Sequence, residues 1–214
     1  MKGIIFDLDG VLVSTDELHY QAWKQLADEL GIVNFTKEDN EKQRGVSRME
    51  SLEIVLSKGN TVYSEKEKEM LAEKKNNYYK ELLQELTDSA VLSGVKETLK
   101  FLKEKGILIG VGSVSKNTPV ILEKTGLLEW IDQVSCGLDI TKSKPDPEVF
   151  LVAAQKLELP CSECLVVEDS AAGITAAKAA GMKSLGVGPF YQELGATYAA
   201  RGLNDVHNWD ELLA

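Results

Sequence analysis

The chain has 214 residues, of which 43% are hydrophobic and 27% are charged, and its formal net charge is −10. This composition is typical of a globular protein and excludes a collagen, a coiled coil or a wholly disordered chain. So acidic a chain is poorly suited to bind nucleic acid or an anionic membrane, because those ligands attract clustered Lys and Arg.

The first predicted element is a buried strand at residues 4–6, and a long helical stretch follows it. Apolar residues recur every four positions in the first helix, which Gly31 ends: Leu18, Ala22, Leu26 and Leu30. Three capping boxes, each a Ser or Thr with an acid three residues later, predict further helix starts at Thr36, Ser47 and Ser64. Residues 15–86 are therefore predicted to be almost entirely helical.

From Val91 onward, apolar runs of strand length alternate with helical patterns. The predicted strands are 107–111, 133–135, 165–167 and 183–187, and the predicted helices are about 95–105, 119–125, 147–157 and 171–180. This alternation predicts a parallel sheet with helices on both faces, which the first strand joins. We thus expect an α/β fold: a Rossmann-like parallel-sheet core domain (1–14 and 87–214) with an inserted helical domain (15–86).

Polar segments follow four of the predicted strands, where ligands bind in parallel sheets. They are Asp7-Leu8-Asp9-Gly10, Gly112-Ser113-Val114-Ser115-Lys116-Asn117, Lys142-Ser143-Lys144-Pro145 and Glu168-Asp169-Ser170. Each segment alone has an ordinary explanation as a turn, a solvated loop or a helix start, with Thr118 and Ser170 as helix caps. Four together at successive strand ends predict a functional site.

The chemistry of these residue types fits phosphoryl transfer. Several carboxylates on one rim need a cation, and oxygen-only ligands favour Mg²⁺. A carboxylate nucleophile forms an aspartyl phosphate, and a second acid two residues away points the same way and can move a proton. Ser113 and Lys144 are suited to bind the phosphate oxygens as charge redistributes.

The same residues resemble the four motifs of the haloacid dehalogenase superfamily of phosphotransferases, in the usual order and across the whole chain. The matching segments are Asp7-Leu8-Asp9-Gly10-Val11-Leu12, Ser113, Lys144-Pro145 and Glu168-Asp169. The resemblance implies that Asp7 is the nucleophile and Asp9 the acid and base. It also implies that Asp7, Asp9, Glu168 and Asp169 surround Mg²⁺, and that the helical insertion is the cap domain of this superfamily.

Within the superfamily, the cap and the loops are similar to phosphomutases of hexose phosphates. This similarity implies interconversion of β-D-glucose 1-phosphate and glucose 6-phosphate through β-glucose 1,6-bisphosphate. The substrate contacts that it implies are Asp9, His19, Trp23, Gly45, Val46, Arg48, Lys75, Ser115, Lys116 and Asn117. Gly112 stands where a small residue such as Ala is usual, and we expect little effect from it.

The cap residues also have simpler explanations. Arg48, in the first turn of a helix capped by Ser47, would face an anion together with backbone N–H groups, or it is a surface charge. Lys75 lies in a Lys/Glu-rich stretch that is typical of a solvated helix face. His19 positions the cap, bonds to the first acids or lies on the surface, and Trp23 contacts the sugar or belongs to the cap core.

Three alternative functions remain open. A phosphatase of the same superfamily, acting on a sugar phosphate or phosphoglycolate, would use the same four core motifs. A non-catalytic phosphate-binding module would keep the fold without turnover. A phosphonatase would need a desolvated Schiff-base Lys in the cap, which the solvated surroundings expected for Lys75 disfavour.

Three further features bear on location and partners. No apolar segment approaches the ~20 residues of a membrane-spanning helix, and the N-terminus does not resemble a signal peptide. The three cysteines do not make a disulfide framework, and Cys161-Ser162-Glu163-Cys164 lacks the further ligands of a zinc site. We expect a cytoplasmic monomer whose partner is a small sugar phosphate, with no nucleic acid and no membrane.

Overall fold

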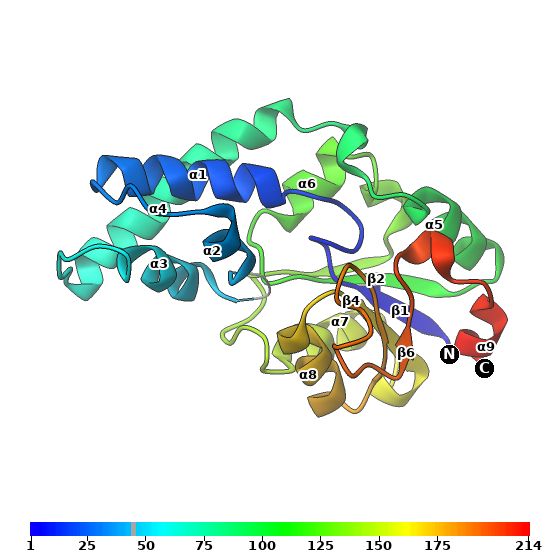
Figure 1. The fold of residues 1–214 in the computed structure, drawn as a ribbon. Helices are drawn as coiled ribbons and strands as arrows, with labels where there is room; N and C mark the ends of the chain where they lie inside the picture. Colours follow the sequence, from blue (N-terminus) through cyan, green and yellow to red (C-terminus); the bar gives the residue numbers. More distant parts are fainter. Residues whose placement is uncertain (44–45) are drawn as a thin grey trace. The chain divides into compact units, whose positions relative to one another are not determined.

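The computed structural model describes residues 1–43 and 46–214, and the chain folds as two compact units. One unit contains residues 1–14 and 87–214 and is an α/β unit, and the other contains residues 15–86 and is helical. Figure 1 traces both along the chain. The α/β fold with a parallel sheet that the sequence predicts is confirmed.

Six parallel strands form one sheet within the described residues, in the order β3-β2-β1-β4-β5-β6. The strands are β1 (Gly3–Phe6), β2 (Leu108–Gly112), β3 (Gln133–Ser135), β4 (Cys164–Glu168), β5 (Lys183–Gly186) and β6 (Tyr198–Ala199). Phe6 at the end of β1 pairs with Val111 of β2 and with Val167 of β4. The chain therefore builds the sheet outward in both directions from β1, and a crevice for ligands is expected at the carboxyl end of that strand.

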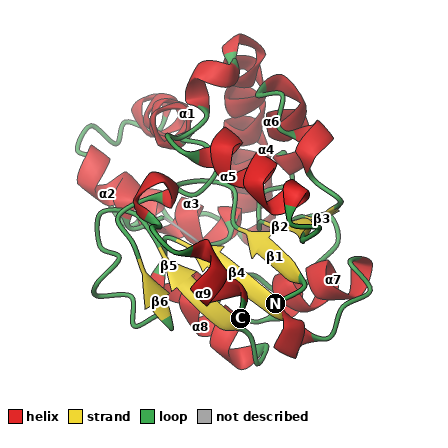
Figure 2. Cartoon of the chain, turned by 90° about the vertical axis from the view of Figure 1, so that its right-hand side faces the viewer, coloured by secondary structure: helices red, strands yellow, loops and turns green. Residues whose placement is uncertain are grey.

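Helices cover both faces of this sheet (Figure 2). They are α5 (Val95–Glu104), α6 (Thr118–Lys124), α7 (Glu148–Lys156), α8 (Ala171–Ala179) and α9 (Trp209–Leu213), with short 3₁₀ turns η2 (Asp88–Ala90), η3 (Leu128–Trp130), η4 (Cys161–Glu163) and η5 (Leu203–Asp205). Alternate strand residues such as Ile5 and Val166 pack against Phe150 and Ala153 of α7 and against Ala176 of α8. The continuous apolar strands are thus buried on both sides, as parallel sheets require.

Two local features differ from the sequence prediction. The cap of α6 is Asn117, not Thr118, because the helix already begins at Thr118. The edge strand β6 was not predicted, since its two residues, Tyr198 and Ala199, have no apolar run of strand length. Both differences lie at element ends, where local sequence patterns carry little information.

The helical unit contains α1 (Asp16–Glu29), α2 (Lys37–Glu41), α3 (Arg48–Leu56), α4 (Glu65–Leu82) and the turn η1 (Leu83–Glu85). All three predicted capping boxes form, at Thr36, Ser47 and Ser64. Trp23 and Leu52 are among the residues of its buried core. No helix in the described part of the chain has the length and apolar character to cross a membrane.

Candidate active site

The ends of β1 and β4 bring three carboxylates together in the α/β unit. Asp7 follows β1 and its backbone N–H donates to the carbonyl of Val167 at 2.9 Å. Glu168 ends β4 and Asp169 follows it. One carboxylate oxygen from each of these three acids lies within 4.8 Å of the other two. Because β1 and β4 are neighbouring parallel strands, acids far apart in sequence meet at the carboxyl ends of these two strands.

Lys144, in the loop after β3, is the cation that the structure pairs with these acids. Its Nζ lies 2.5 Å from Asp7 Oδ1 and 2.6 Å from Glu168 Oε1, and only 1% of its side chain is exposed. Burial by itself lowers the pKa of Lys144, but the two carboxylates outweigh it and raise that pKa above its usual value. Lys144 therefore stays an ammonium ion in the interior.

Glu168 is held by the N-terminus of α8. Its Oε1 accepts from Lys144, and its Oε2 accepts from the N–H of Ser170 at 2.6 Å and from the Ser170 hydroxyl at 2.9 Å. Gly173 leaves room for this carboxylate, because a Cβ there would lie 1.9 Å from Glu168 Oε1. Both oxygens of Glu168 are thus partnered within the protein.

The turn after Asp7 approaches Asp169 closely. The N–H of Gly10 donates to the carbonyl of Val13 at 2.8 Å, which closes the turn that carries the half-buried Asp9. Gly10 has φ +81°, and a Cβ at this position would lie 2.0 Å from Asp169 Oδ2. Glycine is needed here both for its left-handed backbone and for the space beside the carboxylate.

The charge balance of this cluster fits a divalent cation. Three carboxylates and one ammonium leave a formal charge of −2 if all are ionised. Burial raises the pKa of Asp7, Lys144 opposes that shift, and Glu168 and Asp169 add to it. A hard cation would relieve this repulsion, and a donor set made only of oxygens is what such cations take.

The loop after β2 carries the predicted hydroxyl and amide residues of the same unit. The Ser113 N–H donates to the carbonyl of Ser135 at 3.0 Å, and Ser113 Oγ accepts from the N–H of Ser115 at 3.2 Å. Ser115 Oγ in turn accepts from the N–H of Asn117 at 3.2 Å. Ser113 and Asn117 are buried, Ser115 is half-buried and Lys116 is exposed.

In the helical unit, Lys75 of α4 lies in a cage of rings. Its Nζ is 2.9 Å from His19 Nδ1, 4.6 Å from the centroid of the Trp23 ring and 4.8 Å from that of Tyr79. Lys75 is buried, so the prediction of a solvated helix face is wrong for this residue. The Lys/Glu-rich pattern described the outer face of α4, whereas Lys75 and Tyr79, four residues apart, share its inner face.

His19 is neutral in this cage. Burial lowers its pKa well below the usual value, and the charges of Lys75 and Arg48 lower it further. Because an ammonium group can only donate hydrogen bonds, Lys75 is the donor and the neutral His19 Nδ1 is the acceptor. The ring of His19 also stacks on that of Tyr79, with centroids 4.1 Å apart.

Arg48 is the first residue of α3, directly after the capping residue Ser47, as the sequence predicts. Its guanidinium is half-buried, and Nη1 lies 3.2 Å from Glu73 Oε2 of α4. Val46 is half-buried before this helix. Gly45, which is also among the predicted substrate contacts, lies outside the described residues.

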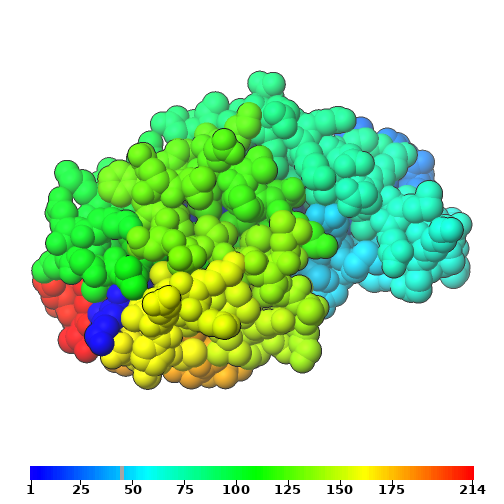
Figure 3. Space-filling view, turned by 180° about the vertical axis from the view of Figure 1, so that it is seen from behind, coloured from blue at the N-terminus to red at the C-terminus, as the bar shows by residue number. Residues whose placement is uncertain are grey.

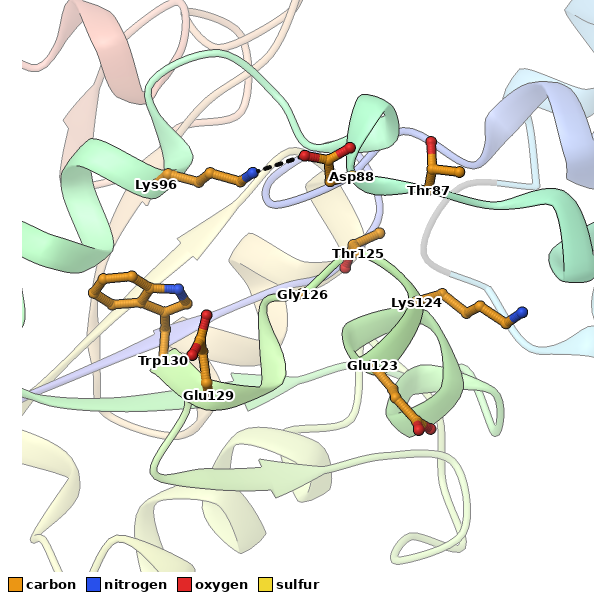
Figure 4. A pocket seen from close by; sticks show the side chains of 9 residues that line it. All are labelled: Thr87, Asp88, Lys96, Glu123, Lys124, Thr125, Gly126, Glu129 and Trp130. Atoms are coloured by element: carbon orange, nitrogen blue, oxygen red, sulfur yellow. Dashed lines mark hydrogen bonds and ion pairs between the residues drawn. The ribbon is translucent and has the colours of Figure 1, made fainter.

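Two other features of the α/β unit lack the properties of a reactive site. Burial raises the pKa of the Cys164 thiol to about 11, whereas a reactive cysteine has a lowered pKa. A separate open hollow of about 530 Å³ is lined by acidic, basic and uncharged residues, among them Glu123, Lys124 and Trp130 (Figure 4). Lys96 at its edge is paired with Asp88 at 3.1 Å, and the hollow shares no residue with the carboxylate cluster.

Comparison with known proteins identifies the family. The profile of the haloacid dehalogenase-like hydrolases matches residues 4–187. The chain belongs to this family. Its members use a divalent metal, in agreement with the carboxylate cluster at the ends of β1 and β4.

Individual relatives are similar over nearly the whole chain. A Beta-phosphoglucomutase from Bacillus subtilis (strain 168) is 40% identical over 96% of this chain and 92% of its own length. A Phosphorylated carbohydrates phosphatase from Thermotoga maritima is 30% identical over 86% of this chain and 84% of its own. The crystal structure of a beta-phosphoglucomutase from Clostridium difficile has a TM-score of 0.91 at 37% identity, covering 99% of this chain and 95% of that one.

Proposed function

We propose that the chain is a Mg²⁺-dependent phosphomutase that interconverts β-D-glucose 1-phosphate and glucose 6-phosphate. The reaction passes through an aspartyl phosphate and β-glucose 1,6-bisphosphate. The observation that carries phosphoryl transfer is the cluster of the buried Asp7, Lys144 and Glu168 with the half-buried Asp169 at the ends of β1 and β4. The full-length similarity to the B. subtilis and C. difficile beta-phosphoglucomutases supports the choice of substrate.

The residues of the α/β unit have distinct roles under this proposal. Asp7 attacks the phosphorus of the bisphosphate and becomes the phosphoryl carrier. Asp9, two residues along, gives its proton to the departing sugar oxygen and takes one from the attacking hydroxyl in the second half-reaction. Ser113 and Lys144 bind the phosphate oxygens as negative charge moves between donor and acceptor.

Asp7, Asp169 and the backbone carbonyl of Asp9 are the groups that we assign to Mg²⁺, with Glu168 beside them. The metal supplies positive charge to the phosphoryl oxygens and lowers the repulsion between phosphate and carboxylates. Because both oxygens of Glu168 already have partners in Lys144 and Ser170, we assign this acid mainly to holding Lys144 beside Asp7.

In the helical unit, Arg48 and Lys75 are proposed to bind the phosphate that is not being transferred. After burial, the charges of Lys75 and Arg48 are the causes that lower the pKa of His19, which supports a role for the two residues in one cationic cluster. Ser115, Lys116 and Asn117 of the loop after β2 are the predicted partners of that phosphate from the α/β unit. Val46 and Gly45 are further predicted substrate contacts, whereas Trp23 is buried in the core of the helical unit, the alternative that the sequence left open for it. Exclusion of water during transfer would protect the acyl phosphate from hydrolysis.

A sugar-phosphate phosphatase is the second candidate, because the T. maritima phosphatase is also similar over most of the chain. The two activities share the carboxylate cluster and differ in whether sugar or water accepts the phosphoryl group. A direct test supplies β-glucose 1-phosphate, the bisphosphate and Mg²⁺ and follows glucose 6-phosphate against free phosphate. We expect mainly glucose 6-phosphate, and predominant free phosphate would favour the phosphatase.

The covalent route has its own test. Asp7→Asn should abolish turnover and the incorporation of labelled phosphate into the protein, and retained mutase activity would refute the aspartyl phosphate. Folded protein without any Mg²⁺-dependent turnover would point instead to a phosphate-binding module. The monomeric state and the cytoplasmic location stay predictions.

A further inference from the structure

We propose that Glu148, in the first turn of α7, is a positioning residue for Lys144. This inference rests on the proposed function, because it concerns how the ammonium group reaches the phosphoryl carrier Asp7. Lys144 lies in the loop of residues 136–147, which connects β3 to α7 and contains no helix or strand. A site residue on such a loop needs contacts that fix the loop to a rigid element.

Glu148 provides these contacts for the segment just before Lys144. Its Oε2 accepts from the backbone N–H of Thr141 at 2.9 Å and from that of Lys142 at 2.6 Å, and it also accepts from the Thr141 hydroxyl at 3.1 Å. These bonds keep the carboxylate ionised, since the backbone bonds to Lys142 and Thr141 lower the pKa of Glu148. The loop is thereby tied to α7 only two residues before Lys144.

Two more contacts continue this attachment across Lys144. Asp146 donates its N–H to the carbonyl of Ser143 at 3.0 Å and accepts the N–H of Glu148 on its Oδ1 at 3.1 Å. The chain on both sides of Lys144 is therefore bound, directly or through one residue, to the first residue of α7.

Phe150, two residues after Glu148, supports the ammonium end of the same side chain. Lys144 Nζ lies 4.8 Å from the centroid of its buried ring, a distance at which a cation and a ring attract each other. The ring has room because residue 112 is glycine: a Cβ on Gly112 would lie 2.8 Å from Phe150 Cδ1. The first turn of α7 thus fixes Lys144 at its backbone and at its charged end.

The start of the loop is fixed by the last turn of α7. Lys156 Nζ donates to the carbonyl of Val134 and to Asp139 Oδ1, each at 2.7 Å. Asp139 Oδ2 accepts the N–H of Cys136 at 2.8 Å. Figure 3 shows the surface formed by this part of the chain, coloured yellow-green to yellow. With both ends held, loosening the Glu148 contacts releases mainly the segment that carries Lys144.

The first experiment compares Glu148→Ala with Glu148→Gln. A displacement of Lys144 by about 1 Å from Asp7 would lower kcat about 10- to 100-fold while KM changes less than about threefold, because Glu148 touches no substrate. Gln keeps a side-chain oxygen for the two backbone N–H groups, so it should retain kcat within about threefold. Gln155→Ala, at an exposed position of the same helix, is the matched control and should leave kcat unchanged.

A double-mutant cycle separates positioning from general weakening of the fold. If Glu148 acts through Lys144, adding Glu148→Ala to Lys144→Ala should cause no further loss of kcat. An equal loss in both backgrounds would overturn the proposal, as would a Glu148→Ala enzyme with wild-type kcat. Circular dichroism and thermal unfolding verify that each variant is folded, and if Lys144→Ala is not, the contrast between Ala and Gln at position 148 decides.

The cycle is measured on two reactions so that the two proposals fail separately. One is formation of glucose 6-phosphate, and the other is Mg²⁺-dependent release of phosphate from β-glucose 1-phosphate. If only phosphate release occurs and it shows the coupling between Glu148 and Lys144, the phosphomutase proposal fails and the positioning role stands. If mutase activity is present and insensitive to Glu148→Ala, the positioning role alone is refuted.

Discussion

The substitution Gly10→Ala tests whether the turn after Asp7 and the Asp169 carboxylate form one site. Gly10 has φ +81°, a left-handed conformation that costs an L-residue ~1–2 kcal/mol. Alanine also restricts the unfolded chain, which returns about 0.4–1 kcal/mol, so the net loss from the backbone is about 1 kcal/mol. The steric effect is separate: the new Cβ would lie 2.0 Å from Asp169 Oδ2, whereas ordinary contact begins at 3.4 Å.

Asp169 must therefore retreat by about 1.4 Å, the difference between these two distances. Because Asp169 is one of the proposed metal ligands, a shift of this size should lower kcat about 100-fold and raise the Mg²⁺ concentration needed for half-maximal activity. The assay is formation of glucose 6-phosphate over a series of Mg²⁺ concentrations, with urea unfolding as the measure of stability.

Gly106 offers a matched control in the same unit. It has φ +70°, and a Cβ there would meet nothing within 4 Å. Gly106→Ala should therefore lose about 1 kcal/mol of unfolding free energy from backbone strain and keep full activity. If Gly10→Ala and Gly106→Ala have the same activity and the same Mg²⁺ dependence, the assignment of Asp169 to the metal site is refuted.

Three further changes test other parts of the structure. Gly112→Ala places a Cβ 2.8 Å from Phe150 Cδ1 and should lower the free energy of unfolding by about 1–3 kcal/mol, and an unchanged urea midpoint would contradict this. His19→Gln should flatten the dependence of stability on pH between about pH 7.5 and 5.5. In this range the unfolded chain binds a proton on His19, whereas the lowered pKa of His19 prevents the folded chain from binding it. The free energy of unfolding of the wild type therefore decreases as the pH decreases, and urea unfolding at several pH values measures this slope. Asp39→Asn should lose about 1–3 kcal/mol at pH 7 because the buried carboxylate lies 2.6 Å from Lys58 Nζ. Hydrogen bonding to Lys58 lowers the pKa of Asp39, so the wild-type advantage should disappear on strong acidification, and an advantage that persists at low pH would refute the pairing.

The fold was predictable because its strands and helices have different patterns of apolar residues. Continuous apolar runs mark the central strands, and Ser-x-x-Glu patterns mark the starts of α3 and α4 at Ser47 and Ser64. The edge strand β6 could not be predicted, since two residues at the sheet edge gain their structure from pairing of Leu185 with Tyr198 rather than from their own sequence. A local pattern of apolar residues shows which side chains of an element are buried, and neither side chain of β6 is fully buried.

The site was predictable only where it follows from topology. Acids directly after neighbouring parallel strands lie close together, so the sequence alone predicts that Asp7 and Asp169 share one site. The cage of Lys75 depends on which face of α4 packs inward. The many Lys and Glu residues around Lys75 made it impossible to predict that face from the sequence of α4 alone. His19 and Trp23, also four residues apart, carried the missing signal: two such pairs on two helices indicate facing stripes.

Gly112 shows a third kind of limit. By itself the glycine is a small residue at the end of β2, and the sequence predicts little effect from it. In the structure its missing side chain is the space for Phe150, whose ring lies beside the ammonium of Lys144. Such a role depends on three segments packing together, so no spacing within one segment could reveal it.

The choice between mutase and phosphatase depends on the helical unit, because the carboxylate cluster serves either acceptor. A sugar that keeps one phosphate while the other is transferred needs a second cationic site, whereas water needs none. We propose that Arg48 and Lys75 supply this second site, beside His19, whose pKa burial lowers well below its usual value. Burying Lys75 in a ring cage has a cost in desolvation, which a bound phosphate at this site would offset. Under the proposal that Arg48 and Lys75 bind the second phosphate, the cage favours a bisphosphate intermediate over transfer to water.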